Sequence, residues 1–362
     1  MDATMTGRER VSRMFERRDH DRVPRHESFW PDTIRRWQAE GLDGDALTVL
    51  LMLDNDFQGL CWCSPRPYPG QDETIAEDEQ TVTVRNDYGA VRRQWKDRSG
   101  TPEHFGFGCD TPQAWKRQYK PALLSAGPFI DFEDMARAYA QGRREQNWCH
   151  LTAVEAFEFT RQLMGDEITM IAMATDPEWV IDVATTHTDL VLRSFDDALA
   201  RGFDPDGVWV YGDMAFNHST FCSPQMYRDL IWPCHKRLAA WTHEHGMKFI
   251  YHTDGDVNGV IDLYLEAGFD CLQPLEAKAK MDVRDLCPRY GDRLACFGNI
   301  DVMVMAAGDR EWIEQEIASK FAAGKATRGY VYHSDHSVPP LVSFGTYKVI
   351  IELVERYGWY NA

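Results

Sequence analysis

The amino-acid sequence predicts an α/β fold, a (β/α)8 TIM barrel with an N-terminal helical extension and a β-hairpin excursion. Short apolar runs alternate with amphipathic segments throughout the second half of the chain, which is typical of parallel βα units. No GxGxxG motif follows any of these runs, which disfavours an open doubly wound sheet. With 44% hydrophobic and 27% charged residues, the 362-residue chain is neither disordered nor a coiled coil.

The first half of the chain is irregular. Two short helices are expected, over Thr6–Arg18 with Thr6 as a cap and over Asp32–Gly41 with Gly41 as its stop. Thr81–Arg85 and Val91–Trp95 alternate in the manner of strands around an Asn-Asp-Tyr-Gly turn. They therefore predict a hairpin that stands outside the main core.

The second half supplies the barrel strands. Five apolar runs predict buried strands, namely Gly207–Tyr211, Met247–Tyr251, Cys271–Gln273, Leu294–Phe297 and Gly329–Tyr332. The helices expected between and after them are Pro224–His245, Val257–Ala267, Val283–Tyr290, Arg310–Ala323 and Phe344–Tyr357. Trp148–Val154 and Val23–Glu27 are weaker strand candidates, which leaves the eighth strand unassigned. We expect one domain over 1–362, with the extension and hairpin in 1–145 and the main βα repeats in 146–362.

Charge and apolar patterning exclude several classes of partner. The net charge of −18 argues against nucleic acid and against a substrate with many carboxylates. No apolar run approaches the ~18–20 residues of a membrane helix, and the N-terminal stretch lacks an apolar signal core, so we expect a cytoplasmic protein that binds no membrane. Nine cysteines without a CxxC motif disfavour a disulfide framework and a thiolate zinc finger. The oligomeric state stays open.

Polar side chains follow the five main predicted strands, at the point where each strand ends. In chain order these are Asp213, His252 with Asp254, Glu276, Asn299 with Asp301, and His333 with His336. The carboxyl ends of parallel barrel strands gather at one mouth, where the chemistry of such barrels takes place. His150 and Glu155, which end or follow the weak strand candidate Trp148–Val154, can point into the same mouth, although a core or surface role suits them equally.

The densest cluster predicts a metal site with an open position. Two ligands one residue apart, His252 and Asp254, can both reach one cation where a strand is just ending, and a third imidazole from a neighbouring loop completes the set. The residues alone leave His333 and His336 as equal choices for that third ligand.

Other residues at the mouth have several possible roles. Glu276 and Asp301 can be ligands, orienting groups or bases. Asp213 has the position of a catalytic or substrate-orienting carboxylate, and also that of a helix cap or a solvated loop residue. Tryptophans are candidates for an apolar pocket wall or for ordinary core and surface positions, namely Trp30, Trp62 and Trp148.

Several stretches of the chain together resemble a known family. They include GRERVSRMFERRDHDRVPRHESFW, NDYGAVRRQWKDRSGTPEHFGF, FTRQLMGDEITMIAMATDPEWV, YGDMAFNHSTFCSPQMYRDLIWP, HTDGDV, QPLEAKAKMDV, GNID and GYVYHSDHSVPP. In this order and spacing they resemble the uroporphyrinogen decarboxylase (URO-D) superfamily, and within it the branch related to cobalamin-dependent methyltransferases. The resemblance implies a (β/α)8 barrel, including the strand that the pattern does not assign.

Two departures shape what this resemblance implies. True uroporphyrinogen decarboxylases hold the carboxylates of the tetrapyrrole with an Arg-containing stretch such as MRQAGR, where this chain has DRVPRHESFW, so we do not expect a true uroporphyrinogen decarboxylase. The methyltransferase branch holds zinc with a His-x-Cys pair and a later Cys. The matching positions here are His252, Asp254 and His336, which implies a harder ligand set suited to zinc, and also to iron, manganese or nickel.

The resemblance also implies an activity. We expect a metal-dependent methyltransferase or demethylase that moves a methyl group between a small methoxy substrate and a corrinoid, the cobalamin-type cofactor, carried by a partner protein. The expected proton donors are Asp213, Glu276 or Tyr332, and the expected substrate-binding residues are His150, Glu155, Asn299, Asp301 and His333. Two alternatives remain. Activity that survives metal removal favours a decarboxylase (carboxy-lyase) acting on a small carboxylate or a porphyrinogen, and a closed pocket favours a non-catalytic ligand-binding barrel.

Overall fold

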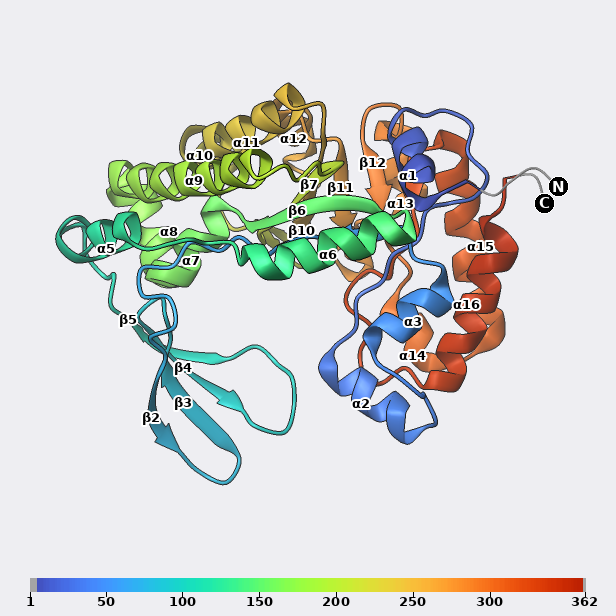
Figure 1. The fold of residues 1–362 in the computed structure, drawn as a ribbon, viewed down its shortest axis with the longest axis horizontal. Helices are drawn as coiled ribbons and strands as arrows, with labels where there is room; N and C mark the ends of the chain where they lie inside the picture. Colours follow the sequence, from blue (N-terminus) through green and yellow to red (C-terminus); the bar gives the residue numbers. More distant parts are fainter. Residues whose placement is uncertain (1–4, 361–362) are drawn as a thin grey trace.

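A curled parallel sheet forms the centre of the molecule in the computed structural model, which describes residues 5–360 (Figure 1). Its strands are β1 (Phe57–Gly59), β6 (Trp148–Val154), β7 (Gly207–Tyr211), β10 (Lys248–Thr253), β11 (Cys271–Pro274), β12 (Ala295–Phe297) and β13 (Tyr330–Val331). They pair in this order, all parallel, so that strands successive in the chain are neighbours in the sheet. This arrangement confirms the predicted TIM-barrel type of fold.

A short segment lies between β13 and β1, the two edge strands of this sheet. The Tyr332 N–H donates to the Pro24 carbonyl (2.8 Å), and the Asp56 N–H donates to the Arg25 carbonyl (2.9 Å). The weak strand candidate Val23–Glu27 therefore takes the eighth position, although it pairs only through isolated bridges. The strand that the sequence pattern left unassigned is β1, which has only three residues.

Helices cover the outer face of the sheet. The longer ones are α6 (Phe132–Glu145), α7 (Ala156–Met164), α8 (Asp166–Thr175), α9 (Pro177–Ala200), α11 (Trp232–Glu244), α13 (Val283–Tyr290), α15 (Arg310–Thr327) and α16 (Phe344–Gly358), with short helices at α10 (Pro224–Leu230), α12 (Ile261–Ala267), α14 (Val302–Ala307) and the 3-10 turn η2 (Ala277–Ala279). Side chains cap the first turns of several of these helices, as Asp176 does for α9 and Ser343 for α16. Within residues 5–360, no helix combines the length and apolar composition that a membrane crossing needs.

The N-terminal part adds helices α1 (Gly7–Phe15), α2 (Pro31–Ala39) and α3 (Ala46–Leu53). The Thr6 side chain caps α1 as expected, by accepting the Glu9 N–H (3.1 Å). The helix ends three residues earlier than predicted, because the chain turns at Arg17, which has a φ of 56°. Helix α2 begins at Pro31, and the chain turns out of it at Gly41, which has a φ of 100°.

A four-stranded antiparallel sheet, which we call the arm, projects from the barrel (Figure 1). Its central strands β3 (Thr81–Arg85) and β4 (Ala90–Trp95) confirm the predicted hairpin. The sequence pattern missed the two outer strands, β2 (Glu73–Glu77) and β5 (Glu103–Phe107). The chain returns to the barrel through α4 (Pro112–Ala114), a π-helical turn η1 (Trp115–Tyr119) and α5 (Lys120–Ser125), and a small hairpin of β8 (Ala215–Phe216) and β9 (Ser219–Thr220) follows β7.

The amino-terminal end of the barrel is filled by side chains. Val11, Met14 and Phe15 of α1 join a buried cluster with inward-facing strand residues, among them Phe57, Trp148, Ile250, Phe297 and Val331. These side chains are almost completely excluded from solvent. Because α1 and this cluster occupy the base, open space inside the barrel lies at the opposite end, where the strands finish.

Candidate functional site

A cavity of about 770 Å³ lies at the carboxyl ends of the barrel strands. Strands β7 and β10 contribute Asp213, His252 and Asp254 to its lining, and the loop after β13 contributes His336. The structure therefore brings together four of the site residues that the sequence predicts. Their place at the mouth matches the position of reacting groups in parallel barrels.

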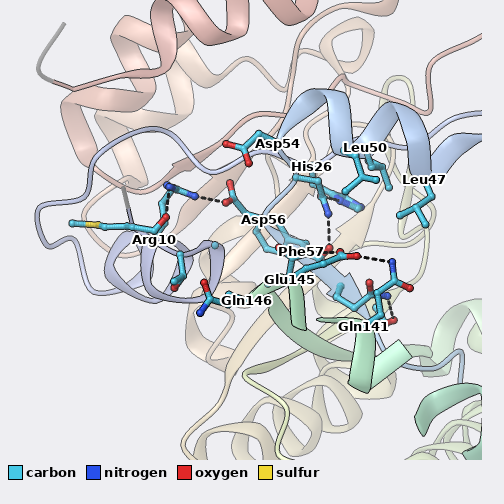
Figure 2. Close-up of a pocket in the computed structure, with 18 of the residues that line it drawn as sticks. Arg10, His26, Leu47, Leu50, Asp54, Asp56, Phe57, Gln141, Glu145 and Gln146 are labelled. Carbon is cyan, nitrogen blue, oxygen red and sulfur yellow. Dashed lines mark hydrogen bonds and ion pairs between the residues drawn. The ribbon is translucent and has the colours of Figure 1, made fainter. Parts of the chain in front are cut away.

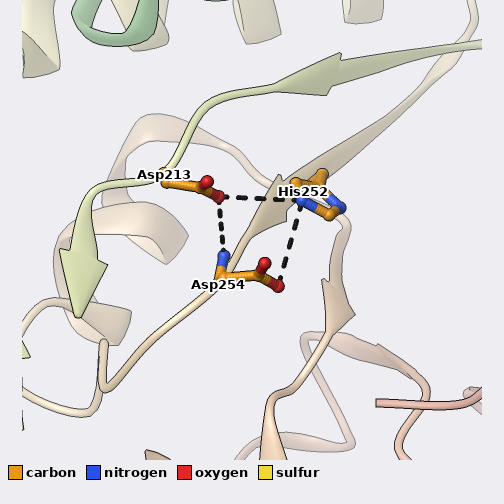
Figure 3. A group of neighbouring side chains, drawn as sticks. All are labelled: Asp213, His252 and Asp254. Carbon is orange, nitrogen blue, oxygen red and sulfur yellow. Dashed lines mark hydrogen bonds and ion pairs between the residues drawn. The ribbon is translucent and has the colours of Figure 1, made fainter. Parts of the chain in front are cut away.

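Asp213, His252 and Asp254 form a compact cluster (Figure 3). One donor atom from each of the three side chains lies within 4.8 Å of the others. His252 Nε2 is 3.7 Å from Asp213 Oδ1 and 4.0 Å from Asp254 Oδ1. The backbone N–H of Asp254 donates to Asp213 Oδ1 (3.0 Å), which fixes the first carboxylate relative to the second.

The hydrogen bonds of this cluster leave room for a cation. Nδ1 of His252 donates to the side-chain oxygen of Gln273, and Nε2 faces the two carboxylates. Asp254 Oδ1 is buried, and no hydrogen-bond partner for it lies in the described part of the chain. Burial raises the pKa of Asp254. An imidazole nitrogen beside two carboxylates is the donor set of a divalent metal ion, so these residues fit one.

The two histidines of the last loop differ in their surroundings. His336 Nε2 lies 3.6 Å from Asp254 Oδ2, and its ring stacks on Trp30 with 5.9 Å between centroids. His333 is buried, and its Nδ1 contacts the Ser334 carbonyl (2.6 Å). Of the pair that the sequence left open, His336 is therefore the one beside Asp254.

The floor of the cavity carries no charge. His150 and His333 both line it, and burial lowers the pKa of each imidazole to about 3, so both rings are neutral. Trp209 of β7 also lines the floor and packs on His150 with 5.1 Å between ring centroids. The sequence pattern did not single out Trp209, because it looks like any other residue of a buried strand.

Comparison with known proteins agrees with this arrangement. The model of the family described as uroporphyrinogen decarboxylase (URO-D) matches residues 167–357, which is more than half of the chain. The chain belongs to the URO-D family. A solved structure of a methyltransferase from Methanosarcina mazei shares the fold of this URO-D family protein with a TM-score of 0.70 and 13% sequence identity, over 98% of this chain and 99% of that chain.

Other comparisons are weaker. A chitinase from Chromobacterium violaceum ATCC 12472 aligns with a TM-score of 0.38 and 9% identity, over 92% of this URO-D chain and 99% of the chitinase chain. No curated protein sequence matches.

Glu155 lies outside the cavity of this URO-D barrel, contrary to its predicted role in substrate binding. Its carboxylate is fully buried and accepts the backbone N–H groups of Phe157 and Glu158 (2.7 Å each), which caps α7. His235 Nε2 lies 2.7 Å from the same carboxylate. The side chain thus holds α7 and α11 together, and it does not line the cavity.

Asn299 and Asp301 also lie outside the cavity. The Asn299 amide is buried and donates to the Leu275 carbonyl (2.8 Å), which joins the loops after β11 and β12. Asp301 caps α14 by accepting the Met303 N–H (2.7 Å). We therefore correct their predicted substrate contacts to a role in shaping the loops of the mouth.

Two of the predicted proton donors have structural partners as well. The Tyr332 hydroxyl is buried beneath the cavity and donates to Glu27 Oε2 (3.2 Å). Glu276 Oε2 accepts the Gly255 N–H (3.0 Å) and so supports the loop after β10. Neither lines the cavity of the URO-D barrel, whereas Tyr211, which the sequence pattern did not select, does.

Two of the three tryptophans that the sequence analysis offers as pocket-wall candidates line the cavity, and the third does not. Trp30 and Trp62 line the cavity, as one interpretation of the sequence allowed. Trp148 lies at the filled base of the barrel, with its ring 5.6 Å from the rings of Phe15 and Phe57. The aromatic wall is therefore built from Trp30, Trp62, Trp209 and Tyr211.

A second cavity, of about 590 Å³, lies beside α1, α3 and α6 (Figure 2). Its charged groups already have partners, since the Arg10 guanidinium pairs with Asp56 inside it and with Asp21 beside it (2.6 Å). His26 Nδ1 lies 2.7 Å from Asn55 Oδ1. We therefore assign this second cavity to the packing of the N-terminal segment against the barrel.

Proposed function

We propose that this URO-D family protein is a metal-dependent methyltransferase, which moves a methyl group between a small methoxy compound and a corrinoid carried by a partner protein. The observation that carries the proposal is the position of His252 Nε2, which faces Asp213 and Asp254 in an open cavity. The shared fold with the methyltransferase from Methanosarcina mazei supports it.

His252, Asp254 and His336 would hold the metal, with Asp213 beside them as a fourth oxygen donor. Zinc suits this set, and iron, manganese or nickel are compatible with it. When bound, such an ion supplies Lewis-acid chemistry, which polarises an ether oxygen. Two carboxylate oxygens and two imidazoles would leave a tetrahedral ion no free position. One of these four ligands must therefore dissociate, or the coordination number must increase, when substrate binds.

Asp213 and Tyr211 are the residues best placed to handle a proton. The Tyr211 hydroxyl donates to Asp213 Oδ2 (3.2 Å), while Asp213 Oδ1 accepts the backbone N–H of Asp254. In the proposed reaction the ether oxygen keeps the electron pair of the broken C–O bond, and cobalt(I) of the partner supplies the pair for the new bond to the methyl carbon. The oxygen then needs a proton or a cation, and Asp213, once protonated, would provide the proton. The Tyr211 hydroxyl keeps its own proton, because burial and the nearby carboxylates raise its pKa, and it orients Asp213.

Family membership favours a second candidate, a decarboxylase that acts on a small carboxylate. In that reaction Asp213 would protonate the carbanion left by loss of carbon dioxide. Its weakness is that a carboxylate substrate usually requires a cationic side chain, and the residues that line the cavity include no Arg or Lys.

The deciding experiment supplies cob(I)alamin and a panel of methoxy compounds to the purified, zinc-loaded protein and follows the methylcobalamin spectrum. We expect methyl transfer that disappears on metal removal and returns on zinc addition. Release of carbon dioxide from a carboxylate without any methyl transfer, and with full activity after metal removal, would instead establish the decarboxylase.

A further inference from the structure

The cavity has a one-sided electrostatic character. Of its lining residues, all of which the structure describes, Asp134, Asp213 and Asp254 are the acidic ones, and none is Lys or Arg. Arg137 pairs with Asp134 at the rim, where both side chains are more than two-thirds exposed, and it does not line the cavity. A carboxylate ligand would therefore meet like charge without a compensating side chain.

Aromatic rings form another part of the lining, beside the acidic groups. Trp62 packs near Tyr211 with 6.0 Å between centroids, and Tyr211 in turn lies 4.8 Å from the His252 ring. Trp30 stacks on His336 on the other flank. His252 and His336 thus each have an aromatic ring beside them, and a flat ligand between these rings would contact ring faces.

Trp62 is only partly covered by its neighbours. It is 53% exposed although it lines the cavity. A large exposed aromatic side chain at the rim of a cavity is characteristic of a ligand-binding surface.

The neutral floor completes the pattern. The floor residues His150, His333 and Trp209 present aromatic rings and neutral hydrogen-bonding atoms to a ligand that enters the cavity. Thr152 Oγ1 lies 3.1 Å from His150 Nδ1, so the orientation of this imidazole is set within the protein. The cavity volume of about 770 Å³ is in the range that suits a compact ring compound.

We propose that the cavity selects uncharged, flat, ring-bearing methoxy compounds and rejects their carboxylate-bearing analogues. The methoxy part of this class rests on the proposed function. The selection by charge and shape rests on the lining residues alone, and it holds whether or not the protein transfers a methyl group.

A pair of probes tests the proposal. 2-Methoxyphenol is neutral at pH 7, and 4-hydroxy-3-methoxybenzoate has the same ring, hydroxyl and ether with one added carboxylate. Binding of each is measured by calorimetry and by quenching of tryptophan fluorescence, with chelator-treated protein and after zinc addition. We expect the neutral probe to bind at least tenfold more tightly to the metal-free protein, and zinc, whose charge offsets that of Asp213 and Asp254, to narrow the difference. Equal binding, preference for the carboxylate, or binding of neither probe by the metal-free protein overturns the proposal.

A variant pair makes the test specific for charge. Thr101 lines the cavity from the exposed β4–β5 loop, so a substitution there should not disturb the core. Thr101→Lys is expected to tighten binding of the carboxylate probe at least fivefold and to leave the neutral probe unchanged, while Thr101→Met changes neither. If Thr101→Lys does not favour the carboxylate probe, the charge argument is wrong. Charge-selective binding without transfer to cob(I)alamin would refute the proposed function and leave this inference intact.

Discussion

The imidazole of His252 donates from Nδ1 to the side-chain oxygen of Gln273, its register partner on the neighbouring strand β11. This bond fixes the ring orientation and keeps the proton away from Nε2, the atom that faces Asp213 and Asp254. A neighbour that orients a ligating histidine in this way is as much a part of a metal site as the ligand itself.

Gln273→Leu is therefore expected to weaken zinc binding 10–100-fold, because His252 loses the acceptor that fixes its tautomer. Gln273→Glu keeps an acceptor at the same position and should retain the affinity. Competition against a fluorescent zinc chelator measures both. Equal affinity in Gln273→Leu and the unchanged protein would show that the hydrogen bond does not tune a metal ligand.

His252→Ala is expected to abolish stoichiometric metal binding without unfolding the chain, since the ring lies at the cavity mouth rather than in the core. Asp213→Ala and His336→Ala should each weaken binding at least tenfold, and their ranking identifies the closer ligand. His243→Ala is the matched control, because His243 pairs with Asp270 (2.7 Å) at the end of α11. Elemental analysis measures the metal content, and circular dichroism shows whether each variant is folded. Full metal content in His252→Ala would disprove the site.

Uroporphyrinogen is not expected to be a substrate. The net charge of −18 repels a polyanion, and the cavity lining offers no Arg or Lys to hold its carboxylates. The measurement is coproporphyrinogen formation, with a genuine uroporphyrinogen decarboxylase as the positive control in the same assay. Product formation at rates comparable with that control would contradict the expectation.

His187 should make the fold sensitive to acid. Its ring is fully buried against Phe159 (4.2 Å between centroids), and within the described residues neither nitrogen has a hydrogen-bond partner. Burial lowers the pKa of His187 to about 3, against ~6.5 in the unfolded chain. The neutral ring therefore makes its full contribution to the free energy of unfolding above pH 6.5. That contribution is lost as the pH falls from 6.5 toward 3, and the loss is ~2 kcal/mol at pH 5.

His187→Leu removes this dependence and the two unsatisfied nitrogens, so it should raise the free energy of unfolding by ~1–3 kcal/mol at pH 7.5 and by more at pH 5. Urea unfolding at the two pH values measures the difference. The exposed His218→Leu substitution is the control and should change little at either pH. An identical effect of His187→Leu at both pH values would contradict the linkage argument.

The loop between β4 and β5 is held near the mouth by Asp32. Asp32 Oδ2 accepts the Ser99 N–H (2.6 Å), and Thr101 of the same loop lines the cavity. Asp32→Ala is expected to increase hydrogen–deuterium exchange of residues 97–101 and to weaken ligand binding severalfold, whereas Asp32→Asn keeps an acceptor and should do neither. Unchanged exchange in Asp32→Ala would show that other contacts hold the loop.

Sequence patterns predicted the strands that lie within apolar runs, including the short β12 and β13, and they failed where no apolar run or alternation marks the strand. Gly207–Tyr211 was predicted with its observed bounds, whereas β1 contains Gln58 between only two other residues. The outer arm strand Glu73–Glu77 is fully exposed, so no alternation of apolar and polar residues marks it.

The candidate site was predictable to the extent that it follows from strand ends. His252, Asp254 and Asp213 meet because adjacent parallel strands finish at the same edge. Glu155 is also at a strand end, but its carboxylate is occupied by His235, which lies eighty residues further along the chain. Which strand-end groups are free for chemistry depends on such distant partners, and local sequence does not contain them.

The plug that α1 forms with Val11, Met14 and Phe15 has a kinetic consequence. It makes the cavity a blind pocket, so both reactants must use the same entrance. In the proposed reaction, a small methoxy compound would have to bind before a corrinoid-bearing partner covers that entrance, and a partner that docks first would obstruct it. Steady-state measurements should therefore show a compulsory order of addition, with excess partner protein acting as an inhibitor that competes with the small substrate.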